Sequence, residues 1–292
     1  MCDQTTEQDF DEALERRGLT RRQFAAAGSA VALAGCSTYS AGEEAPSDEL
    51  SESMARITTE DGVADAFFVH PAKGKHPGVI FWPDIAGVRE AKKIMARRLA
   101  EAGYAVLVVN QYYRSQPAPV MESFAEFMEP GGREKVMGYR ELLTPEAITR
   151  DAKAFVNYLD GEAAVDKTRG IGSNGYCMGG PFTVRTAAAV PDRVGAAASF
   201  HGGGLVTDEP DSPHKLLART KADYLIAVAR NDDARAPDDK VTFGKAADEA
   251  SVDAEIEVYA ADHGWCVPDS PAYDPNEADR AFERMLALFE GL

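Results

Sequence analysis

Short apolar runs alternate with amphipathic segments from about residue 64 to the C-terminus. Runs typical of strands occupy residues 64–69, 78–82, 104–109, 168–173, 196–200, 223–229 and 254–259. Segments with helical spacing occupy residues 89–102, 145–160, 182–189, 239–250 and 276–290. Strands that alternate with helices in this way form a mostly parallel sheet whose two faces are covered by helices. The pattern therefore predicts an α/β fold.

Two of these segments show the expected burial most clearly. Residues 104–109 are apolar throughout, which is typical of a parallel strand buried on both faces. In the predicted helix 89–102, the spacing places Ile94, Ala96 and Leu99 inward. The same spacing directs four basic side chains outward: Lys92, Lys93, Arg97 and Arg98.

Residues 111–144 interrupt the alternation and are rich in Pro, Gly, Glu and Met. A long irregular insertion in a compact domain is usually functional. We expect this one to be a lid or a cover over a substrate site.

Residues 1–36 have the character of a targeting segment. Residues 20–24 (Thr-Arg-Arg-Gln-Phe) and the small, apolar run 25–35 resemble a twin-arginine export signal. Residues 33–36 (Leu-Ala-Gly-Cys) resemble a lipoprotein cleavage box, which would place a lipid anchor on Cys36. Residues 3–15, however, are acidic and predicted helical, whereas signal segments usually begin with basic residues. We expect an exported, periplasmic protein, and a retained cytoplasmic tail is the alternative.

Residues 37–53 are rich in Ser, Glu, Ala and Pro and predict a disordered spacer. The folded domain is expected to span residues 54–292. A chain of 292 residues is long enough for one α/β domain of this size together with a tail.

Charge and cysteine content narrow the function classes. The chain has 48 Asp and Glu against 31 Lys and Arg, a formal net charge of -17. Nucleic-acid partners are not expected, because phosphate backbones are bound by clustered basic side chains. The four cysteines (Cys2, Cys36, Cys177 and Cys266) imply no disulfide framework. No apolar run reaches the roughly 18 residues of a membrane-spanning helix.

The most informative motif is Gly-Tyr-Cys-Met-Gly-Gly, which begins at Gly175. It places Cys177 where an α/β-hydrolase carries the serine of its G-x-S-x-G elbow, between a strand and a helix. Gly175 and Gly179 supply the small neighbours that a strained nucleophile turn requires. The motif predicts an α/β-hydrolase fold with a thiol nucleophile. On the motif alone, a buried structural cysteine is an equal alternative.

A thiol nucleophile needs a base and a group that orients the base. In α/β-hydrolases the acid and then the histidine follow the nucleophile, each after a later strand. Asp232 and Asp233 follow the strand that ends at residue 229, and His263 follows the strand that ends at residue 259. The sequence does not decide between the two aspartates, and we favour Asp232 because it is nearer the strand.

Acyl transfer also needs two backbone N–H groups for the oxyanion. One is expected from Met178, which follows the cysteine, and the other from Ile85 in the loop after the strand 78–82. The neighbouring Asp84 would then point toward the sulfur of Cys177.

Several motifs together resemble the dienelactone hydrolase family over roughly residues 57–292. They are Pro-Asp-Ile-Ala-Gly-Val from Pro83, Tyr-Tyr-Arg from Tyr112, the cysteine elbow, Asn-Asp-Asp from Asn231, and His-Gly-Trp from His263 with Tyr273 downstream. The resemblance implies that Cys177, Asp232 and His263 hydrolyse an enol-lactone or related small ester through a thioester, without a cofactor or metal. It implies that Asp84 contacts the resting thiol and that Arg114 binds a substrate carboxylate. We also expect substrate contacts from Tyr112, Trp265 and His201.

Two other functions remain open. A binding protein could keep the fold without turnover, although the order of the three candidate residues favours an enzyme. A metal site could instead use Cys177, Cys266, His263 and His201, because thiolates and imidazoles are good zinc ligands.

Overall fold

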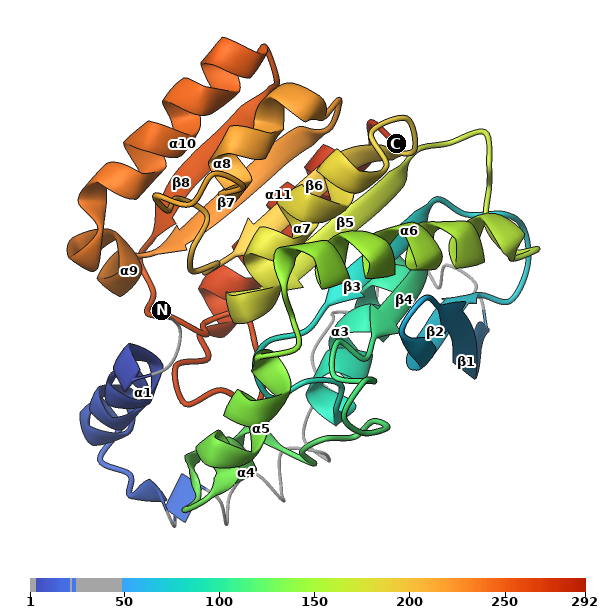
Figure 1. Ribbon diagram of the computed structural model, residues 1–292. Coiled ribbons are helices and arrows are strands. Elements are labelled where there is room, and N and C mark those ends of the chain that lie inside the picture. Colours follow the sequence, from blue (N-terminus) through green and yellow to red (C-terminus); the bar gives the residue numbers. More distant parts are fainter. Residues whose placement is uncertain (1–3, 22, 25–48) are drawn as a thin grey trace, which may run out of the picture.

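The computed structural model describes residues 4–21, 23–24 and 49–292 and is built around an eight-stranded sheet (Figure 1). The strand order is β1-β2-β4-β3-β5-β6-β7-β8. β1 and β2 form an antiparallel hairpin, β2 runs antiparallel to β4, and the remaining neighbours are parallel. The strands are β1 (Leu50–Thr59), β2 (Gly62–Pro71), β3 (Gly78–Trp82), β4 (Ala105–Val109), β5 (Ile171–Tyr176), β6 (Val194–Phe200), β7 (Asp223–Ala229) and β8 (Ala254–Tyr259).

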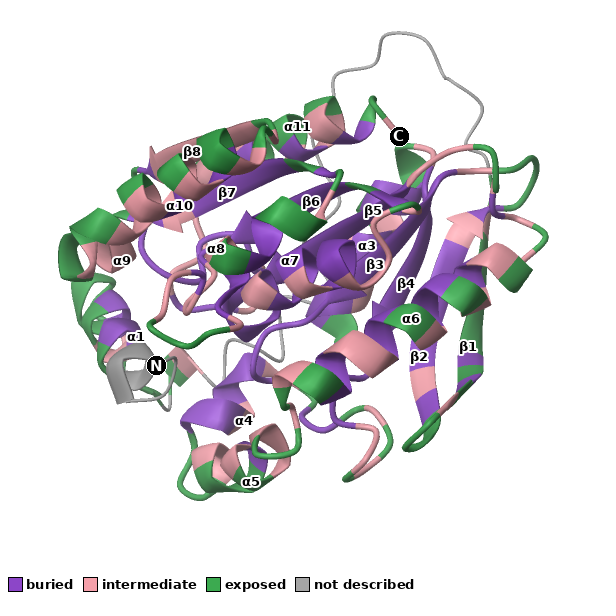
Figure 2. Cartoon of the chain, turned by 45° about the horizontal axis from the view of Figure 1, so that its top comes forward, coloured by how far each residue is buried: buried purple, intermediate pink, exposed green. Residues whose placement is uncertain are grey.

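Helices cover both faces of this sheet, as the sequence predicts (Figures 1 and 2). α3 and α11 pack on one face, and α6, α7 and α10 belong to the other. The helices of the domain are α3 (Glu90–Glu101), α4 (Phe124–Met128), α5 (Gly132–Arg140), α6 (Pro145–Gly161), α7 (Gly180–Ala189), α8 (Pro213–Leu216), α9 (Arg230–Arg235), α10 (Pro237–Ala250) and α11 (Pro275–Phe289). None of the helices in the described part of the chain is long and apolar enough to span a membrane.

The central strands are apolar on both sides because each side meets a helical layer. In β3, Val79 and Phe81 belong to the core beneath α3 and α11, whereas Ile80 and Trp82 belong to the core on the other face. All five residues of β4 are buried. The prediction of a doubly covered strand at residues 104–109 is confirmed.

The predicted orientation of α3 is partly wrong. Ala96 and Leu99 are buried as expected, but Ile94 is 45% exposed and Lys92 is 0% exposed. Lys92 turns inward because its ammonium group forms an ion pair with the buried carboxylate of Asp84, 2.7 Å away. Hydropathy alone could not reveal this, because the partner lies in a different element.

The N-terminal part of the fold also differs from expectation. β1 begins at Leu50, ahead of the boundary predicted at residue 54, because the polar residues 51–53 pair with β2 while their side chains face solvent. The helix expected at residues 3–15 is present as α1 (Gln4–Arg16). α1 contacts the domain beside α9 and the loop after β8 (Figure 1). The apolar run 25–35 and Cys36 lie outside the described residues.

The insertion at residues 111–144 is only partly irregular, because it contains α4 and α5. Phe124, Phe127 and Met128 of α4 and Val136 of α5 are buried. The insertion therefore packs as a pair of short helices against the domain, near the carboxyl ends of the central strands, where the candidate site residues lie (Figure 1).

Candidate active site

Cys177 stands at the sharp turn between β5 and α7. It is the first residue of a 3-10 turn, Cys177–Gly179, and its φ of 53° lies in the left-handed region. A Cβ at Gly175 would lie 2.1 Å from the carbonyl oxygen of Gly179, and a Cβ at Gly179 would lie 2.4 Å from that of Trp82. Glycine is therefore required at both positions, and the strained cysteine has the geometry of a nucleophile elbow.

His263 and Asp232 are brought together by the loop after β8 and by α9. His263 Nδ1 lies 2.7 Å from Asp232 Oδ2, and the His263 backbone N–H donates to Asn231 Oδ1 at 2.9 Å. Burial acts to raise the pKa of Asp232, but the His263 ring and the Arg235 guanidinium outweigh it and lower that pKa. The aspartate is thus an anion that holds one nitrogen of the histidine ring.

Asp233 has a different partner. It is the next residue in α9, where successive side chains point in different directions. Its carboxylate forms an ion pair with Lys240 of α10. The geometry therefore pairs Asp232, and not Asp233, with His263.

Cys177 and His263 share one small cavity of about 10 Å³. Its walls come from the loops at the carboxyl ends of the strands, from α4 and from α1. The lining residues are Phe10, Asp84, Phe124, Cys177, His201, His263, Gly264, Val267 and Ser270.

The two expected oxyanion donors, Ile85 and Met178, are buried and are linked through Tyr112. The Tyr112 hydroxyl donates to the carbonyl oxygen of Ile85 at 2.8 Å and lies 3.7 Å from Met178 Sδ. Gln111 donates to the carbonyl oxygen of Asp84 at 2.8 Å. Tyr112 is 1% exposed, so this geometry makes it a support for the loop and not a residue that faces substrate.

Asp84 lies in the cavity with Cys177, but its carboxylate is held by buried cations. Arg89 donates to both of its oxygens, at 2.7 and 3.0 Å, and Lys92 lies 2.7 Å away. Arg89 also donates to Asp269 from Nε and Nη2, at 2.7 Å each, and to the carbonyl oxygen of Gly87 at 3.1 Å. Burial acts to raise the pKa of Asp84, but Arg89 and Lys92 outweigh it and hold that pKa well below its usual range. Asp84 is therefore a fixed anion beside the thiol.

His201 is a second histidine in the same cavity. It is 1% exposed and has a left-handed backbone, with φ 42°. Neither ring nitrogen has a hydrogen-bond partner among the residues that the structure describes. Its ring packs edge to face on His263 at 4.7 Å and on Trp265 at 5.1 Å. Burial lowers the pKa of His201 well below its usual value, with a smaller contribution from His263, so the ring is neutral.

Three other candidate residues lie apart from Cys177. Arg114 donates twice to the buried Asp151, at 2.8 Å each, and also bonds Asp61, so its guanidinium is already paired. Trp265 is 0% exposed, stacks on Tyr259 and lies behind His201. Cys266 lines a separate cavity with Tyr176 and Phe200, and burial raises the pKa of its thiol. In the described ranges, no three His, Cys, Asp or Glu side chains cluster as metal ligands would.

Comparison with known proteins decides the family. The model of the "Dienelactone hydrolase family" matches residues 64–292. The chain belongs to the dienelactone hydrolase family. This confirms the resemblance seen in its motifs and supports activity as a hydrolase.

Individual relatives of this dienelactone hydrolase family member are distant. A Methylorubrum extorquens protein named "Putative carboxymethylenebutenolidase" is 30% identical over 178 residues, 58% of this chain and 56% of the relative. A Bradyrhizobium protein named "Probable 2-oxo-3-(5-oxofuran-2-ylidene)propanoate lactonase" is 26% identical over 227 residues, 76% and 86% of the two chains. The solved structure of a "Putative Dienelactone Hydrolase" from Klebsiella pneumoniae is 23% identical with a TM-score of 0.71, and the match covers 84% of this chain and 100% of that one. The predicted α/β-hydrolase fold is confirmed.

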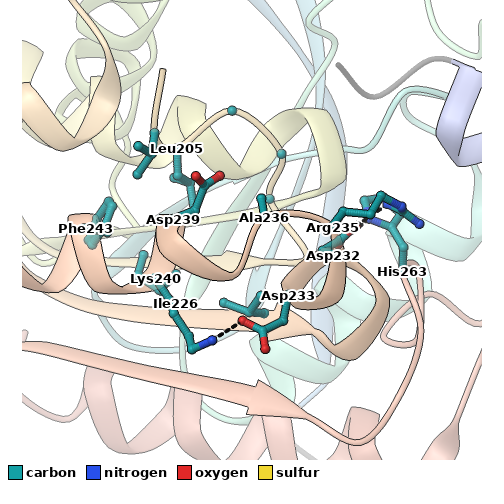
Figure 3. Close-up of a pocket in the computed structure, with 15 residues that line it drawn as sticks. Leu205, Ile226, Asp232, Asp233, Arg235, Ala236, Asp239, Lys240, Phe243 and His263 are labelled. Atoms are coloured by element: carbon teal, nitrogen blue, oxygen red, sulfur yellow. Dashed lines mark hydrogen bonds and ion pairs between the residues drawn. The ribbon is translucent and has the colours of Figure 1, made fainter. Parts of the chain in front are cut away.

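Two larger cavities of this family member border the site. One, of about 180 Å³, adjoins Asp232 and His263 and has apolar walls that include Ile226 and Phe243, with the Lys240–Asp233 pair at its side (Figure 3). The other, of about 430 Å³, adjoins Met178 and is lined by Arg140 and Arg185. Gly203 and Gly204 line both, so the two cavities are neighbours.

Sequence reasoning missed Phe10, Phe124, Arg89 and Lys92. The two basic residues follow Asp84 by five and eight positions but lie in a different element, so their spacing does not reveal the ion pairs. Nor does any sequence signal identify Phe10, which is 74 positions from Asp84, the nearest other residue of the cavity along the chain.

Proposed function

We propose that this chain hydrolyses a small carboxylic ester or lactone, with Cys177 as nucleophile, His263 as base and Asp232 as the acid that orients the base. One observation carries the proposal. Cys177 stands at a left-handed elbow and shares a cavity with a histidine whose Nδ1 lies 2.7 Å from the carboxylate of the partly buried Asp232. Nucleophilic catalysis uses this arrangement of groups on several unrelated folds.

The first half of the reaction forms a thioester. The Cys177 proton passes to His263 Nε2, and Sγ adds to the carbonyl carbon of the substrate. The backbone N–H groups of Ile85 and Met178 stabilise the oxyanion. As the tetrahedral intermediate collapses, the C–O bond to the alcohol breaks and His263 returns the proton to the departing oxygen. In a lactone the alcohol stays attached to the acyl chain.

In the second half, water is the nucleophile and the sulfur of Cys177 is the leaving group. Water gives a proton to His263 and adds to the thioester carbonyl; as the C–S bond breaks, His263 returns that proton to Cys177 Sγ. The products are a carboxylic acid and the regenerated thiol. Asp232 carries its negative charge throughout and stabilises the imidazolium that forms in each half.

The names of the relatives support a lactone or enol-ester as the substrate class, since both describe the opening of a ring ester. Arg114 is poorly suited to bind a substrate carboxylate, because ion pairs with Asp61 and Asp151 already neutralise the charge of its guanidinium. The cavity beside Met178 is lined by Arg140 and Arg185, but Arg185 already pairs with Asp211 at 2.9 Å. This lining therefore does not by itself select a carboxylate-bearing substrate. His201 offers a neutral imidazole to a polar group of the substrate.

The test compares wild type with Cys177→Ala on 4-nitrophenyl acetate. We expect kcat/KM to fall by about 10³-fold or more, because the nucleophile is lost. Cys266→Ala is the matched control and should keep wild-type turnover. A Cys177→Ala variant that still hydrolyses the ester would overturn the proposal. No turnover in wild type on a lactone and ester panel would favour a binding protein, and loss on chelation that zinc restores would favour a metal site.

A further inference from the structure

α1 contributes one wall of the cavity that holds Cys177, through the side chain of Phe10. Polar contacts attach α1 and the residues that follow it, up to Arg21, to the loops around the site at separate points. Asp9 pairs with Arg235, and Arg16 pairs with Asp262, the residue before His263. Further along the segment, Arg17 donates to the carbonyl oxygen of Tyr273 and Arg21 to that of Met128.

The face of α1 that meets the domain is apolar. Phe10, Ala13 and Leu14 have the i, i+3, i+4 spacing of one helix face and are 2%, 4% and 2% exposed. The Phe10 ring packs edge to face on Phe124 at 4.6 Å and stands 6.4 Å from the His263 ring. Aromatic rings prefer this arrangement.

The domain has a shaped recess for this ring. Gly264 has φ 95°, and a Cβ there would lie 3.0 Å from Phe10 Cε1 and 2.6 Å from Ser270 Oγ. A side chain at position 264 would therefore compete with the ring for space. Phe124, Val267 and Gly264 form apolar walls that place the ring beside Cys177 and His263.

With Phe10 in place, the space left beside Cys177 is about 10 Å³. One water molecule needs about 10–15 Å³ of such space. No ester group fits there, so α1 and a substrate exclude each other.

We propose that the recess filled by Phe10 is a subsite for an aromatic or similarly sized apolar group of the substrate, and that α1 is an internal competitor for it. The proposal rests on the function proposed above. Aromatic character follows from the occupant and from the walls. Release of α1 is feasible because short isolated helices are marginal in water and because the arginine of each ion pair, Arg16 and Arg235, is partly exposed to solvent. Cleavage before Cys36, which the resemblance of residues 33–36 to a lipoprotein cleavage box implies, would remove α1 as well.

The first test measures how accessible Cys177 is. Full-length wild type, Leu14→Glu and Phe10→Ala are treated with iodoacetamide, and alkylation of the Cys177 peptide is followed by mass spectrometry. The thiolate displaces iodide, so this readout does not depend on ester hydrolysis. We expect both variants to react about tenfold faster or more, because each loses apolar burial that holds α1 in place. Glu15→Gln changes an exposed residue of α1 and should react at the wild-type rate.

The second test measures what the recess accepts. The ratio of kcat/KM for 4-nitrophenyl phenylacetate to that for 4-nitrophenyl acetate should rise in Leu14→Glu relative to wild type. If both variants are alkylated at rates within twofold of wild type, the proposal that α1 competes with substrate is wrong. An unchanged ester ratio would overturn the aromatic subsite. If no variant hydrolyses either ester, the proposed function fails, while faster alkylation would still show that α1 blocks Cys177.

Discussion

The hydroxyl of Tyr112 donates a 2.8 Å hydrogen bond to the carbonyl oxygen of Ile85. This bond fixes the loop whose N–H is proposed to stabilise the oxyanion. Tyr112→Phe should lower kcat by about tenfold and leave KM nearly unchanged, because a displaced donor weakens binding of the transition state more than that of the substrate. Steady-state kinetics on one ester measure both constants.

The adjacent Tyr113 provides a matched control. Its hydroxyl donates to Asp151 at 2.7 Å, away from the Cys177 cavity. Tyr113→Phe should leave kcat within about twofold of wild type if the Tyr112 effect acts through the oxyanion loop. Equal losses in the two variants would show that Tyr112 has no special part in turnover.

Asp232 and Asp233 are neighbours with different partners, which allows a paired comparison. Asp232→Asn should lower kcat by about 10³–10⁴-fold, because the amide cannot stabilise the imidazolium. Asp233→Asn loses an ion pair with Lys240 and should change kcat by less than about threefold. A larger loss in Asp233→Asn than in Asp232→Asn would reverse the assignment.

The Asp84 carboxylate stabilises the fold through two buried cations. Asp84→Asn should lower the free energy of unfolding at pH 7 by about 3–5 kcal/mol, because Arg89 and Lys92 are left with less counter-charge. Urea denaturation measures this, and Asp84→Asn with Lys92→Met should recover part of the loss.

The difference in free energy of unfolding between wild type and Asp84→Asn should depend on pH with a definite sign. Because the folded-state pKa of Asp84 is lowered, its contribution is present above the unfolded pKa of about 3.9 and is lost as pH falls through the folded value. The gap between wild type and Asp84→Asn should therefore narrow in acid. A gap that widens below pH 4 would contradict the ion-pair account.

His201 predicts a separate acid sensitivity. Burial lowers the folded-state pKa of its ring, so the unfolded chain binds one more proton below about pH 6.5. Below that pH, the free energy of unfolding of wild type should fall faster than that of His201→Gln, by up to about 1.4 kcal/mol for each pH unit. Above pH 7.5 the difference between the two proteins should not depend on pH. Parallel curves from pH 7 to pH 5 would show that His201 can be protonated in the fold.

The sequence predicted the sheet and its helical layers well, because strands such as 104–109 are buried on both faces and are apolar throughout. The positions of Asp232 and His263 were predictable for a related reason. Parallel strands end at one edge of the sheet, so residues that follow the ends of β7 and β8 must lie close together. Their order after Cys177 then suggested their roles.

Other features depended on contacts that periodicity does not encode. The helical spacing of residues 89–102 directs Lys92 outward, and only the position of Asp84 reverses this. The Tyr-Tyr-Arg motif suggests that Arg114 binds a substrate carboxylate, but in the structure its guanidinium forms ion pairs with Asp61 and Asp151. The acidic N-terminal helix was predicted, but its docking was not, since three small or apolar side chains (Phe10, Ala13 and Leu14) and a few ion pairs make the contact.

Direct detection of the acyl-enzyme tests the central claim. Wild type is mixed with excess 4-nitrophenyl ester, quenched in acid within the first turnovers, and examined by intact and peptide mass spectrometry. We expect one acyl group on the peptide that contains Cys177, labile to hydroxylamine and missing in Cys177→Ala. An acyl group on any other residue, or turnover by Cys177→Ala at the wild-type rate, would contradict it.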